Sequence, residues 1–190
     1  MSGPIDDALA IAQAKKESGN SFLKEALQVP AGEGQETLFR KALKEYHDGY
    51  LHLRSVDVSE SKKEGFDDLL TGFLEEKQKK TDEQKSQLKA LKVAIWNNMA
   101  LIYHKQKKFE RVEGAVENIL GFEPKNEKAL LKGVHSGFET NNLDRVEARL
   151  KALDQLGTVN EEEMKRWKHR LEVEIGKSSQ GLKDKLKNMF

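Results

Sequence analysis

Lys128 and Lys132 are the residues of this sequence whose type and spacing most clearly suggest binding chemistry. They lie four positions apart, soon after the helix-stop sequence Pro124-Lys125-Asn126, and neither has an acidic residue three or four positions away. Residues four apart share one face of a helix, and like charges there repel by about 0.2–0.5 kcal/mol. The whole chain nearly balances 33 Lys and Arg against 32 Asp and Glu. We therefore predict an anionic ligand at these two lysines.

A repeat with a period of 34 residues supplies the elements that would position the lysines. Four apolar residues of one segment correspond to four of a later one: Phe109, Val112, Val116 and Ile119 to Leu143, Val146, Leu150 and Leu153. This period is the length of the tetratricopeptide repeat, a helix-turn-helix unit. Aromatic, aliphatic, small and helix-breaking residues continue the pattern upstream at Trp96, Met99, Ala100, Tyr103 and Pro124. The sequence thus predicts an all-α fold.

We expect a single tetratricopeptide-repeat domain over residues 6–190, with three repeats in a right-handed superhelix and a C-terminal capping helix. Its parts are a first repeat (12–56), an insertion (57–80), a second repeat with an extended first helix (81–125), a third repeat (126–156) and a cap (160–190). Apolar periodicity and breaker residues predict helices at about 6–28, 35–56, 81–106, 109–121, 126–140, 143–156 and from 160 onward.

Three finer expectations concern the insertion and the cap. Residues 65–70 are expected to form a short helix within the insertion, and the cap helix is expected to break at residues 176–179, which read Gly-Lys-Ser-Ser. The solvent-facing side of the cap is expected to carry ion pairs four residues apart, Glu161 with Lys165, Glu162 with Arg166 and Lys168 with Glu172.

Composition excludes several classes of function. The 190 residues include 34% charged residues and no cysteine, so disulfides and thiolate chemistry are absent. No signal peptide or long apolar segment is present, and a net charge of +1 argues against a nucleic-acid partner. The five histidines show no metal-binding spacing, and no phosphate-binding loop or nucleophile motif occurs. We expect a non-catalytic cytoplasmic protein without a cofactor, a metal or a membrane partner.

The repeat register brings five polar residues onto the first helices of the three repeats, where they are expected to face the concave groove: Lys16, Asn20, Asn98, Lys128 and Lys132. Lysine supplies a point charge, and the N–H groups of asparagine add direction without charge. His135, three residues after Lys132, is a candidate extension of the same anion site.

The chain resembles the tetratricopeptide domains of immunophilin-type co-chaperones, and most closely the tetratricopeptide repeat protein 9 family and the C-terminal half of aryl-hydrocarbon-receptor-interacting-type proteins. The motifs that carry the resemblance are Lys-Glu-Ser-Gly-Asn-Ser-Phe at 16–22, Trp-Asn-Asn-Met-Ala at 96–100, Asn-Glu-Lys-Ala-Leu at 126–130, Lys-Asn-Met-Phe at 187–190 and the insertion after the first repeat.

The resemblance implies a two-carboxylate clamp for the Glu-Glu-Val-Asp C-terminus of the ninety- and seventy-kilodalton heat-shock chaperones. Its positions match Lys16, Asn20, Asn98, Lys128 and Lys132, of which the first three would hold the main-chain carboxylate. The last position is usually arginine in the family. Lys132 keeps the charge there but lacks the planar fork that binds a carboxylate through two hydrogen bonds.

Three alternatives remain open at the level of sequence. The scaffold could bind a non-chaperone peptide, or the chain could be the repeat half of a larger immunophilin. The C-terminal segment could also bind calmodulin or an anionic lipid surface, because its apolar and basic residues alternate as in an amphipathic helix: Leu182, Lys183, Lys185, Leu186, Lys187, Met189 and Phe190. For this segment we favour docking of the apolar face on the cap helix.

Overall fold

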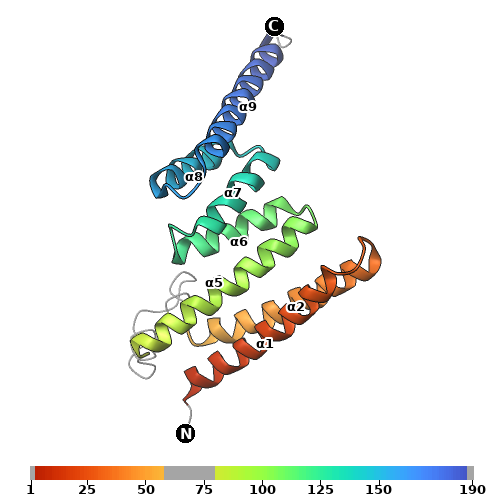
Figure 1. Cartoon of the computed structure of the whole chain (residues 1–190), viewed down its shortest axis with the longest axis vertical. Coiled ribbons are helices and arrows are strands. Elements are labelled where there is room, and N and C mark those ends of the chain that lie inside the picture. The colour runs from red at the N-terminus through yellow and green to blue at the C-terminus, as the bar shows by residue number, and fades with distance from the viewer. Residues whose placement is uncertain (1–2, 58–79, 188–190) are drawn as a thin grey trace. The chain divides into compact units, whose positions relative to one another are not determined.

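The computed structural model describes residues 3–57 and 80–187, and within these ranges the chain is all-α. Figure 1 shows the helices in chain order: α1 (Pro4–Ala26), α2 (Glu33–Ser55), α5 (Asp82–Lys105), α6 (Phe109–Phe122), α7 (Glu127–Glu139), α8 (Leu143–Leu156) and α9 (Glu161–Lys187). The predicted fold class is confirmed, and every predicted helix boundary in the described ranges lies within two residues of the observed one. The short helix predicted at 65–70 lies outside the described residues.

Local sequence explains where several helices begin and end. Asn126 precedes α7 and accepts a hydrogen bond from the Ala129 backbone N–H, and Asn142 caps α8 in the same way through Arg145. These contacts satisfy N–H groups that have no partner inside the helix. Gly157 ends α8 with a φ of 63°, a left-handed conformation that glycine adopts without steric cost.

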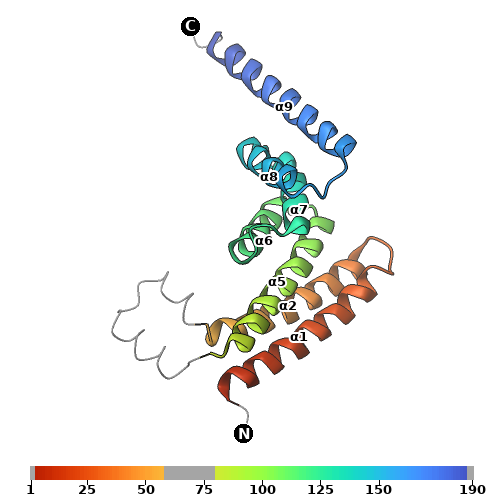
Figure 2. The same cartoon turned by 60° about the vertical axis from the view of Figure 1, so that its left-hand side comes forward.

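The chain divides into two compact units, residues 1–102 and 103–190. In the first unit, α1 and α2 lie antiparallel and side by side (Figure 2). Their interface is built from fully buried side chains, which include Ala12, Ala26, Phe39, Ala42, Tyr46 and Leu53. Burying this apolar surface stabilises the pair by about 25 cal/mol per Å².

A buried ionic cluster connects the two ends of the predicted insertion. Asp57 follows α2, and its carboxylate lies 2.8 Å from Lys92 Nζ on α5 and 3.2 Å from Lys80 Nζ just before α5. Lys92 is fully buried, and this carboxylate compensates its charge. The side chains that flank residues 58–79, Asp57 and Lys80, are thus joined to each other.

In the second unit, α6, α7 and α8 pack in sequence, and the repeat predicted from the sequence is visible in their burial. Val112, Val116 and Ile119 of α6 are fully buried, and so are their counterparts on α8, Val146, Leu150 and Leu153, to within 2% exposure. Equivalent positions of the 34-residue period therefore serve the same packing role.

Glu113 and Arg149 form a second buried ion pair, between α6 and α8. Two hydrogen bonds of 2.8 Å join the guanidinium to the carboxylate, and Ser136 of α7 also donates to Glu113. Gly133 makes room for the pair, because a Cβ at this position would lie 2.7 Å from Arg149 Nε. Burial raises the pKa of Glu113. The hydrogen bonds from Arg149 and Ser136, the charge of Arg149 and a hydrogen bond from Arg145 together outweigh burial and lower the pKa.

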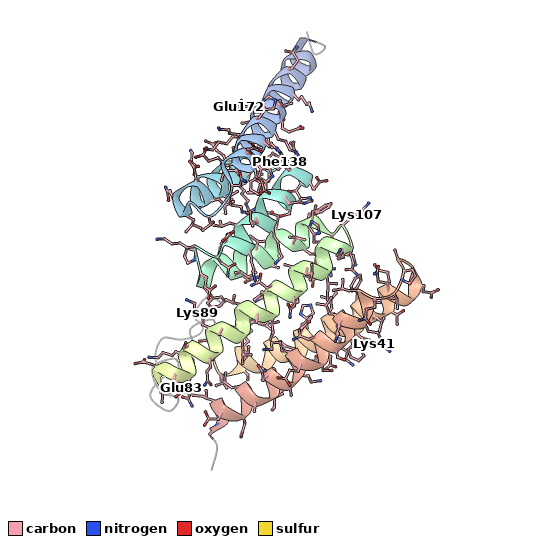
Figure 3. The ribbon with its side chains drawn as sticks, viewed as in Figure 1. Lys41, Glu83, Lys89, Lys107, Phe138 and Glu172 are labelled. Carbon is pink, nitrogen blue, oxygen red and sulfur yellow. The ribbon has the colours of Figure 1, made fainter. Side chains whose placement is uncertain are left out.

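The cap helix α9 packs through Met164 and Leu171 on the apolar cluster of α7 and α8. Phe138 of α7, labelled in Figure 3, lies under the guanidinium of Arg170, 4.3 Å from ring centre to Cζ. The predicted ion pairs of Glu161 and Glu162 are confirmed, at 3.9 and 3.5 Å. The pair predicted between Lys168 and Glu172 is wrong, since Lys168 contacts Asp154 of α8 at 3.1 Å.

The break predicted at residues 176–179 is also wrong, because α9 continues through them to Lys187. A single glycine costs a helix only about 1 kcal/mol relative to alanine, and no proline follows to end it. Figure 2 shows the C-terminal half of α9 extending beyond α8. The docking predicted for residues 182–190 lies outside the side chains that the structure describes.

Among the residues that the structure describes, no helix has the length and apolar character needed to cross a membrane.

Candidate functional site

Lys16 lies on α1 at the edge of an open groove in the first unit. The groove has a volume of about 660 Å³, and α1 and α5 form its walls. Its other lining residues are mostly small or apolar: Leu9, Ala10, Ala90, Leu91 and Ala94, with Asp6, Gln13 and Gln87 as the polar members. Lys16 is half-buried in this lining, a position that a long cationic side chain with an aliphatic stem can occupy.

Asn20 lies one helical turn after Lys16, and it contacts Asn98 of α5 directly. The Nδ2 group of Asn98 donates a hydrogen bond of 2.7 Å to Asn20 Oδ1. These residues are 78 positions apart in the sequence, and the fold of the first unit brings them together. Two of the five predicted site residues are therefore neighbours. Lys16 lies on the same face of α1 as Asn20, because the two are four residues apart.

Tyr46 of α2 is the third member of this polar cluster. Its hydroxyl group donates a second hydrogen bond of 2.7 Å to Asn20 Oδ1, while its ring is fully buried. Burial raises the pKa of Tyr46 to about 12, so the hydroxyl keeps its proton over the physiological range. The sequence does not identify Tyr46 as a site residue, because helical spacing predicts a buried ring but gives no information about the partner of its hydroxyl group.

Lys128 and Lys132 lie one turn apart near the start of α7 in the second unit, as predicted. The Asn126 cap fixes where α7 begins, and the spacing of four residues places both lysines on one face of the helix. Lys132 is half-buried, and its pKa is lowered by burial and by the charge of Lys128. A bound anion would oppose both effects, because it favours the protonated form of each lysine.

His135 extends this basic face together with His104 at the end of α5. His104 Nε2 and His135 Nδ1 lie 3.3 Å apart, and Phe109 packs against both rings. The pKa of His104 is lowered by burial, then by His135, Lys105 and Lys132, and Glu139 partly opposes these effects. His135 was a sequence candidate and His104 was not, since a contact across 31 residues matches no local spacing.

The five predicted residues thus form two groups, one in each unit. Lys16, Asn20 and Asn98 belong to the first unit, and Lys128 and Lys132 belong to the second. The first group offers one positive charge with amide groups beside it, and the second offers two positive charges one turn apart. Both arrangements suit carboxylates. The first group offers a charge and directional N–H donors, and the second offers charge alone.

No protein-family model matches the chain, and neither does any curated protein. Among solved structures, the chain is similar to the C-terminal TPR-containing domain of a Plasmodium falciparum protein named as an FK506-binding protein. The TM-score is 0.61 at 17% sequence identity, and the match covers 96% of this chain and 97% of that domain. This likeness shows that the chain has the tetratricopeptide-repeat fold.

Proposed function

We propose that this chain is a non-catalytic adaptor that binds the acidic C-terminal peptide of a cytosolic heat-shock chaperone of the ninety- or seventy-kilodalton class. The observation that carries the proposal is the Lys128–Lys132 pair, which lies one turn apart on α7, where burial and then the charge of Lys128 lower the pKa of Lys132. Such an arrangement costs free energy in the free protein, and an anion relieves that cost. The repeat fold supports the coarser part of the proposal, binding of a protein partner.

In this proposal the C-terminal aspartate of the peptide supplies the two carboxylates. Lys16, Asn20 and Asn98 bind the main-chain carboxylate, because they combine a positive charge with directional N–H groups. Lys128 and Lys132 bind the side-chain carboxylate as point charges. The partner is a cytosolic protein, so the proposed location of the chain is the cytoplasm.

Calorimetry with two peptides tests the function. A Met-Glu-Glu-Val-Asp peptide should bind with a dissociation constant in the micromolar range, and its C-terminally amidated twin should bind more weakly by about 1.5–3 kcal/mol. Amidation removes one charge and leaves all side chains intact, so this difference measures recognition of the terminal carboxylate. Equal affinity for the two peptides would eliminate the clamp.

Variants of matched charge locate the binding surface. Lys16→Ala and Lys128→Ala should each weaken binding of the free acid. Lys89→Ala is the control in the first unit, because Lys89 is exposed and lies nine residues from Asn98, about half a turn around α5 at 100° per residue. A loss in the Lys89 control as large as in Lys16→Ala would indicate non-specific charge attraction.

Lys132 favours a second candidate, a peptide whose last residue is not aspartate. The related clamps usually have arginine here, and lysine gives up the two-pronged geometry for a side-chain carboxylate. If the aspartate-ended tail is the ligand, Lys132→Arg should tighten binding by up to about 1 kcal/mol, and Lys132→Ala should weaken it more than Lys125→Ala does. Weaker binding by the arginine variant would favour the second candidate.

A further inference from the structure

We propose that Tyr46 is a positioning residue for peptide binding: its buried hydroxyl group fixes the carboxamide of Asn20 so that the Nδ2 group points outward to receive the terminal carboxylate. The inference rests on the proposed function and extends it to a residue outside the five that the sequence identified.

Two hydrogen bonds fix the orientation of the Asn20 carboxamide. Its Oδ1 atom accepts from Tyr46 Oη and from Asn98 Nδ2, each at 2.7 Å. A carbonyl oxygen has two lone pairs, and both are used here. Oδ1 and Nδ2 lie on opposite branches of the same planar group, so fixing the oxygen toward α2 and α5 directs the nitrogen away from them. Asn20 is exposed, and its Nδ2 group can therefore reach a ligand.

Close packing holds the ring of Tyr46 in place. The side chain is fully buried, and its ring lies directly against α1 at Gly19. A Cβ atom at position 19 would lie 2.6–2.9 Å from three ring carbons, so only glycine allows this approach. The Gly19-Asn20 pair therefore combines two roles: glycine admits the ring, and asparagine receives the hydroxyl hydrogen bond at the next residue.

Without Tyr46, the Asn20 side chain would have no fixed orientation. An exposed asparagine samples several rotamers and both orientations of its amide, and only some of them present an N–H donor to a carboxylate. Ordering such a side chain during binding reduces affinity, and ordering it beforehand avoids that loss. Since the Tyr46 hydroxyl group keeps its proton, it supplies the same donor at every physiological pH.

Tyr46→Phe tests the inference, because phenylalanine keeps the buried ring and removes only the hydroxyl group. We expect the free-acid peptide to bind about three- to tenfold more weakly, the effect of one hydrogen bond, while the amidated peptide loses less. Tyr103→Phe is the matched control: Tyr103 is also buried, and its hydroxyl interacts with Arg111. In an Asn20→Ala background, Tyr46→Phe should change affinity by less than about twofold, because both changes remove the same effect.

A second readout needs no peptide. In the wild-type chain, the side-chain amide of Asn20 should show restrained motion by NMR relaxation, and in Tyr46→Phe it should become as mobile as that of the exposed Asn141. A purely structural role for Tyr46 would lower the melting temperature and leave both the amide mobility and the acid-to-amide preference unchanged.

The outcomes separate the two proposals. A wild-type chain that prefers the free acid, with Tyr46→Phe within twofold of it, would retain the clamp and overturn the role of Tyr46. An Asn20 amide that stays restrained in Tyr46→Phe would overturn that role as well. A wild-type chain without any preference would overturn the clamp and, with it, the positioning inference.

Discussion

At the scale of single residues, Gly19 is a position where helix propensity and packing oppose each other. Alanine is favoured over glycine inside a helix, but a Cβ here would overlap the Tyr46 ring. We predict that Gly19→Ala lowers the free energy of unfolding by about 1–3 kcal/mol, the usual cost of overpacking a core. Gly114→Ala on α6 is the control, since a Cβ there meets no atom within 4 Å. It should stabilise the chain by about 0.4–1 kcal/mol, measured by urea denaturation.

His104 makes stability depend on pH. Its folded-state pKa is lowered, so the folded chain binds fewer protons than the unfolded chain once the pH falls below the ordinary histidine value. The contribution of His104 is therefore present above about pH 6.5 and is lost as the pH falls through the lower folded-state pKa. The groups that face it are His135, Lys105 and Lys132, with Glu139 opposing them.

We accordingly predict a lower urea midpoint at pH 5.5 than at pH 7.5, and a smaller difference in His104→Asn. Glu113 also has a lowered pKa, but it starts from 4.5, so its protonation falls below this pH window. A His104→Asn chain with the wild-type pH dependence would show that another group is responsible.

At the scale of helices, Asp57 joins α2 to α5 through the buried Lys92. Removing one partner of a buried ion pair is strongly destabilising, so Asp57→Ala should cost about 3–5 kcal/mol of unfolding free energy. The exposed pair of Asp82 and Lys85, at 2.9 Å, is the control, and Asp82→Ala should change stability by about 1 kcal/mol or less. Equal effects in the two variants would mean that Lys92 gains hydration when Asp57 is absent.

Helix positions could be predicted from the sequence because each helix has a long apolar stripe and a marked end. The predicted start of α7 follows the stop signal that ends at Asn126, and α8 has the bounds predicted for it, with Asn142 and Gly157 as its caps. The two errors in α9 have the same origin. In both cases a local pattern was given too much weight: a single glycine without a following proline does not end the helix at Gly176, and Lys168 contacts Asp154 of α8 and not a residue of its own helix.

The candidate site was less predictable than the helices. A repeat register identified Asn20 and Asn98 as members of one site, and the structure joins them by a hydrogen bond. The same register does not identify Tyr46 or His104. Their contacts depend on side-chain packing, because Tyr46 lies 26 positions from its partner Asn20 and His104 lies 31 positions from His135.

At the scale of the whole molecule, the two groups of site residues belong to different units, which gives a test by stoichiometry. If one peptide uses both groups, calorimetry should give one peptide per chain, and Lys16→Ala and Lys128→Ala should each weaken that single event. Their effects should add in the double variant, since they act on different carboxylates. Two peptides per chain, each sensitive to only one of the variants, would instead identify two independent sites.

The contact between Asp57 and Lys80 also has a consequence for protein engineering. The residues on either side of 58–79, Asp57 and Lys80, are joined by an ion pair with 3.2 Å between their charged atoms. Helices α2 and α5 are thus connected there by side chains as well as by the backbone. A foreign domain whose own termini lie close together could therefore replace residues 58–79, and the protein would serve as a carrier that displays a second binding module.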